Sequence, residues 1–247
     1  MEYFKSFNDV FYKFGQEEST VSIQDLSSYV DIIDDVKDDI AVYQKGYISE
    51  GMRPDQLSYQ VYGTTIYHWT FYLLNDNLRL QGWPLTRSEL EATVKERFNH
   101  TVITTREYFH DKFKSGQTVV GSVSGASGVI NHRNLDFGQI VLEKTNNLNF
   151  RSGEAVTSQT NVNGEAVTQS LVITSSSEEY NAAHHYISNS TDTIVDIDPT
   201  IGPGQLITEV TNWEYFRDEN EKLRDVKVIR PNIIENLAAS YRQAISS

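Results

Sequence analysis

A short internal repeat in the middle of the chain constrains the fold more than any other feature. Residues 113–119 read FKSGQTV and residues 150–156 read FRSGEAV, so the two copies begin 37 positions apart. Between 113 and 177 the sequence is rich in Gly, Ser, Thr, Asn and Val, which is typical of strands joined by turns. The repeat therefore predicts two related β units that close one small barrel or sandwich. The alternative is two hairpins that begin alike by chance.

Nearer the N-terminus, an acidic segment has the period of a helix. Residues 17–39 contain eight acidic residues and one basic residue. Apolar residues recur there every three or four positions, which predicts a helix with one buried stripe. Those residues are Leu26, Val30, Ile33, Val36 and Ile40. The acids are either a solvated face or a docking face for a basic partner, for which the candidates are Asp34, Asp35, Asp38 and Asp39.

Residues 53–77 predict two short helices crowded with aromatic side chains. Pro54 suits the first turn of a helix, and Gly63 suits a left-handed helix end. The second helix is expected to be capped by Thr64 or Thr65. The residues expected on its buried face are Ile66, Trp69, Thr70 and Leu73.

Asn75, Asp76 and Asn77 then supply turn chemistry. The aromatic crowding before them has two interpretations, a small core filled with rings or a surface that stacks on sugars. Tyr67 and Trp69, together with Trp83 further on, are the candidate core or contact residues.

The rest of the chain predicts a mixture of helices and strands. A capping box formed by Thr86 and Glu89 predicts a helix over 87–98. Towards the C-terminus, residues 193–197 resemble a strand and residues 213–223 a helix. Residues 226–229 predict a buried strand. Pro231 is expected to open a last helix that carries Ile234, Leu237, Ala238, Tyr241 and Ile245.

Composition excludes several classes of protein. The net charge of −13 would repel a phosphate backbone, so nucleic acid is a poor partner. The absence of Cys excludes disulfides, thiol catalysis and Cys-based metal sites. No apolar stretch approaches the roughly 20 residues that span a bilayer, and the first residues do not have the pattern of a signal peptide.

No pattern in the sequence predicts catalysis, a cofactor or a metal. The glycines of the β segment do not form a phosphate-binding loop, and neither a His-Glu-x-x-His nor a Gly-x-Ser-x-Gly pattern occurs. Asp192, Asp196 and Asp198 do not have EF-hand spacing. Adjacent His184 and His185 are expected on opposite faces of a strand. We therefore predict that the chain is not an enzyme.

Several stretches together resemble a known family. The pattern resembles the βααβ LysM module and, more closely, the LysM-like core of the baseplate wedge protein 53 family of T-even-like contractile-tailed phages. The residues that carry it are Arg53-Pro54-Asp55, Leu57, Tyr62-Gly63, Trp69, Leu74-Asn75-Asp76-Asn77, Gly82-Trp83, Glu219-Asn220-Glu221-Lys222-Leu223-Arg224, Val226, Val228 and Ile229. The β segment from Phe113 to about Ser177 departs from the compact family pattern and is expected to be an insertion.

The resemblance implies an α+β fold with a LysM-like βααβ core, flanking helices and an inserted small all-β domain, either a barrel or a sandwich. The expected divisions are 1–46 with the acidic helix, 47–112 with the core and capped helix, 113–177 with the β domain, and 178–247 packing back on the core.

The implied function is that of a structural protein of the tail baseplate in the virion, assembled in the host cytoplasm. It would contact other wedge proteins and a neighbouring wedge around the central hub, in a multiple of six copies. Two alternatives remain open. They are a LysM-type peptidoglycan-binding protein, whose exposed rings would stack on N-acetyl sugars, and a tail-associated cell-wall hydrolase that uses some of the many carboxylates.

Overall fold

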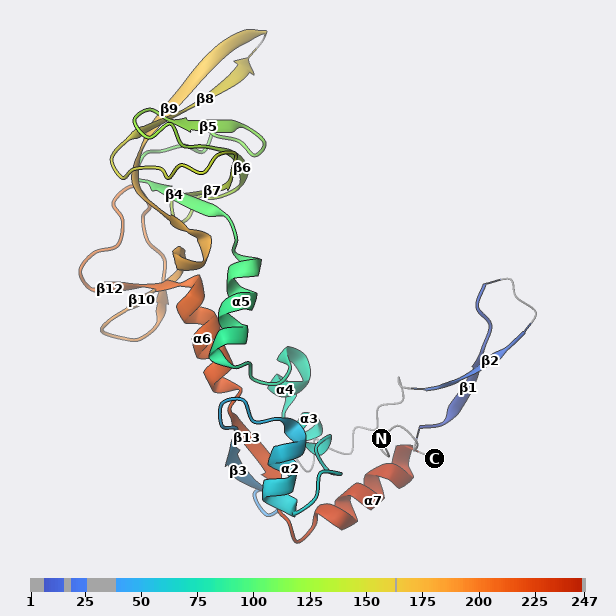
Figure 1. The fold of residues 1–247 in the computed structure, drawn as a ribbon. Coiled ribbons are helices and arrows are strands. Elements are labelled where there is room, and N and C mark those ends of the chain that lie inside the picture. Colours follow the sequence, from blue (N-terminus) through green and yellow to red (C-terminus); the bar gives the residue numbers. More distant parts are fainter. Residues whose placement is uncertain (1–6, 16–18, 26–38, 163, 246–247) are drawn as a thin grey trace. The chain divides into compact units, whose positions relative to one another are not determined.

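A computed structural model describes residues 7–15, 19–25, 39–162 and 164–245 of the chain. The described residues have a mixed α+β fold with six α-helices and several antiparallel sheets (Figure 1). The chain divides into two compact units, and we describe each by itself. The first comprises residues 1–87 and 219–247, and the second residues 88–218. In the described portion no helix combines the length and the apolar character needed to cross a bilayer.

The first unit is organised around a two-stranded sheet whose strands come from opposite ends of the chain. Strand β3 (Tyr43–Tyr47) pairs antiparallel with β13 (Asp225–Ile229), with Tyr47 opposite Asp225. The predicted buried strand at 226–229 is thus confirmed, since Val226, Val228 and Ile229 are buried. The remaining elements of this unit are α2 (Pro54–Tyr62), α3 (Thr70–Leu74), α4 (Asp76–Gln81) and α7 (Ile234–Ile245).

Local signals set the bounds of α2, and the prediction for it is confirmed. Pro54 is its first residue, and Gly63 follows its end with a left-handed φ of 72°. The Gln56 side chain accepts a hydrogen bond of 2.9 Å from the backbone N–H of Arg53, so a polar group satisfies the helix start.

The second predicted helix differs from the structure. Helix α3 begins at Thr70 rather than at Thr64 or Thr65, and Ile66 is 44% exposed instead of buried. A further helix, α4, begins at Asp76, where the sequence predicts a turn. Asn75 separates the two helices with extended backbone angles (φ −121°, ψ 102°). Asp76 then pairs with Arg79 at 2.9 Å across the first turn of α4, which favours the helix.

Two apolar clusters form the core of the first unit. One joins α3 and α7, with Trp69 and Tyr241 at a ring separation of 5.3 Å. The other joins α2, α4 and the sheet through Leu57, Leu78 and Val228.

The predicted final helix is present as α7, although it starts at Ile234, after a turn that follows Pro231.

The second unit contains a closed six-stranded antiparallel barrel. Its strands are β4 (Thr101–Thr105), β5 (Thr118–Gly121), β6 (Ser127–Asn134), β7 (Gln139–Lys144), β8 (Ala155–Val162) and β9 (Glu165–Glu178). They pair in the order β4-β7-β6-β5-β8-β9, and β9 closes the ring on β4. Strand β4 precedes the range 113–177 over which the sequence predicts the β domain. The interior is filled by apolar side chains such as Ile103, Ile140 and Leu142.

The two copies of the repeat hold equivalent places in this barrel. Phe113 and Phe150 are both buried in its interior. The third residue after each Phe is a glycine with a left-handed φ, 86° at Gly116 and 82° at Gly153. Each glycine N–H donates a hydrogen bond of 2.8 Å across the barrel wall, to the backbone oxygens of Ile130 and Ile173. The copies lead into β5 and β8, which are neighbours, so the prediction of two related units in one barrel is confirmed.

The second unit also contains a three-stranded sheet in the order β11-β10-β12. Its strands are β10 (Ala183–Ser188), β11 (Ile194–Val195) and β12 (Ile207–Thr211), preceded by a 3-10 turn, η2 (Glu179–Asn181). Helices α5 (Arg87–Arg97) and α6 (Asn212–Lys222) carry the chain into and out of this unit, close to their predicted bounds.

The expectation for His184 and His185 is wrong. Their Nδ1 atoms lie 2.9 Å apart instead of on opposite faces of β10. The cause is a register shift between Ala183 and His185, because a bulge breaks the alternation of side chains along a strand.

Candidate functional site

Two asparagines join distant parts of the first unit. The side chain of Asn75 behaves like a paired strand residue towards Lys227, accepting a 2.8 Å hydrogen bond from its N–H and donating one of 2.8 Å to its carbonyl. Asn220 pairs with Leu85 in the same way, at 2.8 and 3.0 Å. Both asparagines are buried. Each therefore satisfies two backbone groups that would otherwise be buried without a partner.

Arg224 completes this network. Its guanidinium is buried, with 4% of the residue exposed. It donates hydrogen bonds to the carbonyls of Ile48 at 3.3 Å and Leu85 at 3.4 Å, and its Nε contacts the Glu221 carboxylate at 3.0 Å. Nearby, the ring N–H of Trp83 donates to the Met52 carbonyl at 2.6 Å. Asn75, Asn220 and Arg224 form what we call the closing network, since their hydrogen bonds fasten the two chain segments of this unit to each other.

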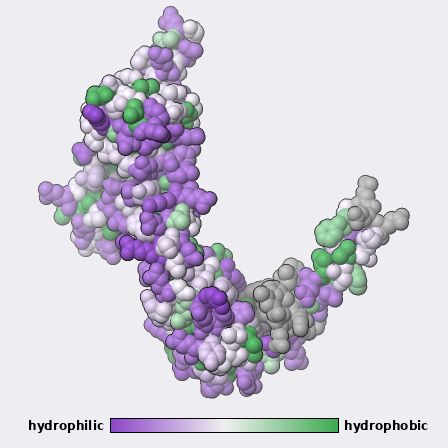
Figure 2. Space-filling model, viewed as in Figure 1, coloured by the Kyte–Doolittle hydropathy of each residue, from purple (hydrophilic) through white to green (hydrophobic). Residues whose placement is uncertain are grey.

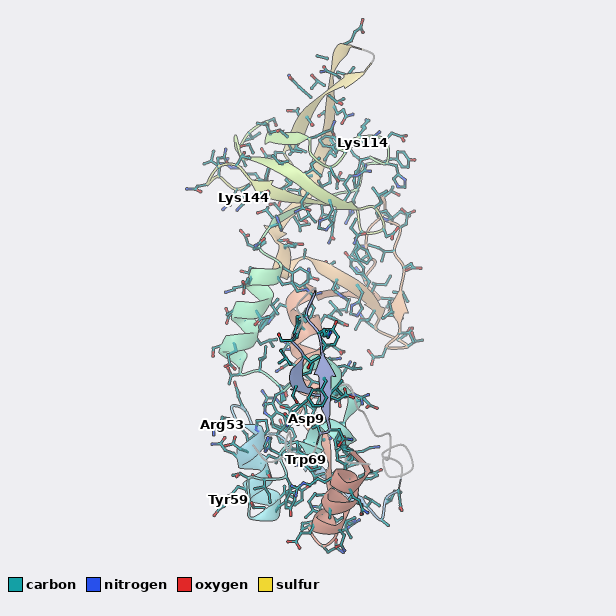
Figure 3. All side chains as sticks on the ribbon, turned by 90° about the vertical axis from the view of Figure 1, so that its right-hand side faces the viewer. Asp9, Arg53, Tyr59, Trp69, Lys114 and Lys144 are labelled. Atoms are coloured by element: carbon teal, nitrogen blue, oxygen red, sulfur yellow. The ribbon has the colours of Figure 1, made fainter. Side chains whose placement is uncertain are left out.

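The candidate contact residues occupy different environments. Tyr67 and Trp69 are 9% and 6% exposed and belong to the core of the first unit. Figure 3 labels Trp69. Trp83 is partly buried and packs near Phe71 at a ring separation of 6.2 Å. Asp39 is exposed, and its carboxylate accepts a 2.8 Å hydrogen bond from the backbone N–H of Ala41.

The proposed acidic docking face lies almost entirely outside the described residues. Asp34, Asp35 and Asp38, with most of the predicted helix, fall in 26–38. Ile40, the last residue of its predicted buried stripe, is in a turn and is 71% exposed. The stripe therefore does not extend to Ile40 as a buried position.

The largest group of exposed apolar side chains described in the first unit lies on an N-terminal hairpin. Strands β1 (Asp9–Tyr12) and β2 (Val21–Gln24) pair antiparallel with each other and, among the described residues, with no third strand. We call its apolar side chains, which are between 40% and 73% exposed, the hairpin surface (Figure 2). They are Val10, Phe11, Tyr12, Phe14, Val21 and Ile23.

The register gathers four of these side chains on one face of the hairpin. Val10 lies opposite Ile23, and Tyr12 lies opposite Val21. Because side chains alternate between faces along a strand, these two pairs share one side. The ring of Phe14 meets that of Tyr12 edge to face at 5.0 Å. An isolated two-stranded hairpin is only marginally stable in water, so a covering surface would stabilise this one.

The hairpin surface is not among the features that the sequence predicts. A signal for it exists, because the first 15 residues contain six aromatic residues. Four of these aromatics, Phe4, Phe7, Phe11 and Phe14, are spaced three, four and three positions apart. That spacing is the period of a helix, whereas residues 9–12 form a strand, so periodicity favours the wrong element there.

Two observations concern the ionisable side chains of the described residues. Among them, no group of three or more His, Asp or Glu side chains is placed to hold a metal ion. The most strongly held carboxylate is that of Glu154, which accepts hydrogen bonds from the N–H groups of Val123, Ser124 and Arg151 and from the Ser124 hydroxyl. These bonds are internal to the barrel and tie one turn to another, so they support a structural role for Glu154.

The sequence matches no protein-family model and no curated protein.

Proposed function

We propose that this chain is a structural protein of a contractile phage tail baseplate, related to the wedge protein 53 family and built on a LysM-like βααβ core. One observation carries the proposal. Residues that carry the resemblance lie in segments more than a hundred positions apart and belong to one closing network. It joins β13 to Asn75, between α3 and α4, and joins Asn220 and Arg224 to the segments after α4 and β3. Shared buried contacts of this kind favour a common fold over chance similarity of short motifs.

The arrangement of the first unit fits a LysM-like core interrupted by an insertion. The order β3, α2, α3 and then β13 gives the βααβ pattern, with the two strands paired antiparallel. The second unit falls between α4 and β13 in the chain, and its barrel is the part that departs from the compact family pattern.

The hairpin surface supports a role in assembly. Exposed aromatic side chains provide large, rigid contact areas at low entropic cost. Asp9 and Asp25 lie at the open end of the hairpin, and the chain as a whole carries a charge of −13. A second copy of the chain would meet like charge, so we assign this surface to another wedge protein that offers an apolar strip with basic residues beside it.

The peptidoglycan-binding alternative receives less support. It requires exposed rings that stack on N-acetyl sugars, and the candidate rings of Tyr67 and Trp69 are buried in the core. The hydrolase alternative rests only on the abundance of carboxylates. Sedimentation of the full chain with purified peptidoglycan and loss of turbidity in a cell-wall suspension test these two alternatives.

The direct test is quantitative mass spectrometry of purified phage particles and isolated tails, which counts copies of this chain against sheath and hub proteins. We expect a multiple of six copies that stay with the baseplate. Absence of the chain from particles would overturn the proposal.

A second experiment isolates the hairpin surface. The triple variant F11S/Y12S/F14S is expected to enter tails at least tenfold less than wild type in a complementation assay. The control V120S/V167S replaces two apolar residues of the barrel that are also exposed, each 41% in the wild type. If the hairpin variant enters tails as well as wild type, the hairpin surface has no role in assembly. That result would not affect the assignment of the chain to the baseplate.

A further inference from the structure

The second unit contains a cavity of about 280 Å³. It is bounded by outward-facing residues of β4, β7 and β9 on one side and by β10 and β12 on the other, with Pro199, Gly202 and Pro203 at its rim. This volume is close to the lower end of the roughly 300–1,000 Å³ range of small-molecule sites. The cavity therefore suits a small ligand that contains a single ring.

The barrel side of the cavity presents polar groups that lack protein partners. Within the described residues, the guanidinium of Arg106 and the hydroxyls of Thr104, Ser175 and Ser177 form no hydrogen bond or ion pair. Arg106 and Ser175 are exposed, and Thr104 and Ser177 are half-buried, so a ligand in the cavity can reach them. Gln139 is only 6% exposed, and its amide makes a single long hydrogen bond, 3.4 Å to the carbonyl of Ala183. Of these groups only Gln139 is buried and needs a partner, and a polar ligand that met it would also meet the exposed groups beside it.

The opposite side supplies an aromatic ring and a carboxylate. Tyr186 is buried, and its ring meets Phe137 edge to face at 5.4 Å. Burial raises the pKa of Tyr186 to about 12, and the neighbouring Glu209 adds to this shift. Burial also raises the pKa of Glu209. The tyrosine hydroxyl and the Glu209 carboxyl interact with each other, so this side of the cavity supplies a polar pair beside an aromatic ring.

The rim is held in shape before any ligand arrives. Asp198 accepts hydrogen bonds from the backbone N–H of Thr200 at 2.9 Å and from its hydroxyl at 2.6 Å. Gly202 has a left-handed φ of 83°, and a Cβ there would lie 2.8 Å from the Arg106 guanidinium, so the arginine packs closely on this turn. Two prolines further restrict the rim. A preformed site loses less entropy when it binds.

We infer that this cavity binds a single saccharide unit that carries a carboxylate, such as a hexuronic acid. Hydroxyl, amide and carboxyl groups match a ring of sugar hydroxyls, and the Arg106 guanidinium matches a carboxylate in fork geometry. The lining has one arginine and one glutamate, so it has too little positive charge for a nucleotide and too few carboxylates for a metal. The polar wall disfavours an apolar ligand. This inference concerns a different unit from the proposed LysM-like core and does not depend on the baseplate assignment.

The test uses the full recombinant chain and saturation-transfer NMR with D-glucuronate, D-glucose and acetate. We expect binding of glucuronate in the millimolar range, at least tenfold tighter than that of glucose or acetate. The variant R106Q should weaken glucuronate binding at least tenfold. The control R217Q removes the same charge from the exposed partner of Asp218 in the same unit and should bind like wild type.

Each other outcome counts against the inference. Equal binding of glucose and glucuronate with no effect of R106Q would overturn the role of the arginine. Acetate binding as tight as glucuronate binding would overturn the saccharide assignment. No saturation transfer to any of the three compounds would overturn the site itself. Circular dichroism of each variant verifies that the fold is intact.

Discussion

The barrel and the sheet of the first unit are closed in different ways. In the barrel, every strand pairs with two neighbours, and backbone hydrogen bonds run around the whole ring. In the first unit, the sheet has only two strands, and side chains of the closing network satisfy the backbone groups around it. The stability of the barrel therefore depends mainly on the apolar side chains that fill its interior. The stability of the first unit depends on a few polar side chains, because no further strand pairs with its two-stranded sheet.

Removing a barrel aromatic is the largest perturbation that we predict. Phe113→Ala should lower the free energy of unfolding by about 4 kcal/mol, because it leaves a cavity in a closed interior. Phe150→Ala should cost a similar amount, since the two rings hold equivalent places in the repeat. Hydrogen exchange measured by mass spectrometry should show lost protection in all six barrel strands, with β3 and β13 little changed. Lost protection confined to β5 would contradict the view of the barrel as one cooperative unit.

The second prediction concerns the closing network. Arg224→Met keeps the length of the side chain and removes the donors to Ile48 and Leu85. The buried Ile48 carbonyl loses its guanidinium partner, whereas the Leu85 carbonyl keeps its hydrogen bond from Asn220. We expect a loss of about 3 kcal/mol in the free energy of unfolding, measured in urea. Protection should fall in β3 and β13 and stay in the barrel. Arg217→Met, at an exposed position, is the control and should change stability by less than about 0.5 kcal/mol.

The third prediction distinguishes the two copies of the repeat by pH. Burial raises the pKa of Glu154, but the hydrogen bonds from Arg151, Ser124 and Val123 outweigh it and lower the pKa from 4.5 to about 2. The folded state therefore favours the carboxylate, and the resulting stability is present above pH 4.5 and is lost as pH falls towards 2.

Glu154→Gln tests this dependence. The variant should be about 2 kcal/mol less stable than wild type at pH 7, because it presents an amide to donors that need an acceptor. The difference between the two proteins should shrink steadily from pH 4.5 to pH 2. Urea titrations at pH 7, 4 and 3 measure it, and a difference independent of pH would show that the carboxylate charge is not the cause.

The smallest effect is expected at the equivalent position of the first copy. Gln117 accepts a 2.6 Å hydrogen bond from the N–H of Lys114, as Glu154 does from Arg151 at the same distance. It has no counterpart of the bonds from Val123 and Ser124. Gln117→Glu should therefore change the unfolding free energy by less than about 0.5 kcal/mol at pH 7. A large gain in stability would indicate donors around Gln117 that the structure does not contain.

Signals that act over a few residues were readable from the sequence. Pro54 and Gly63 bound α2 because their backbone preferences decide the conformation locally. The repeat predicted related β units because identical spacing of Phe, Gly and Val requires similar turns. The bounds of α5 and α6 were also close to those observed.

Features set by distant partners were not readable. Asn75 was interpreted as part of a turn, although its side chain pairs with Lys227, about 150 positions away. The bulge that brings His184 beside His185 depends on the pairing of β10 with β12. Of the candidate contact residues, Tyr67 and Trp69 are buried, which fits their interpretation as core residues, and the Asp39 carboxylate contacts its own turn. The hairpin surface was not predicted, because the aromatics at positions 4, 7, 11 and 14 have the spacing of a helix.

The pairing of β3 with β13 has a consequence during synthesis of the protein. Tyr47 leaves the ribosome 178 residues before its partner Asp225. At a synthesis rate of roughly 5–20 residues per second, β3 has an unpaired edge for about 10–40 s before β13 is made. The barrel strands emerge during this interval. The first unit is thus the last to be completed, although it contains the N-terminus. A product that ends before residue 225 lacks the closing strand, so an incomplete chain remains distinguishable from a finished one by its open sheet.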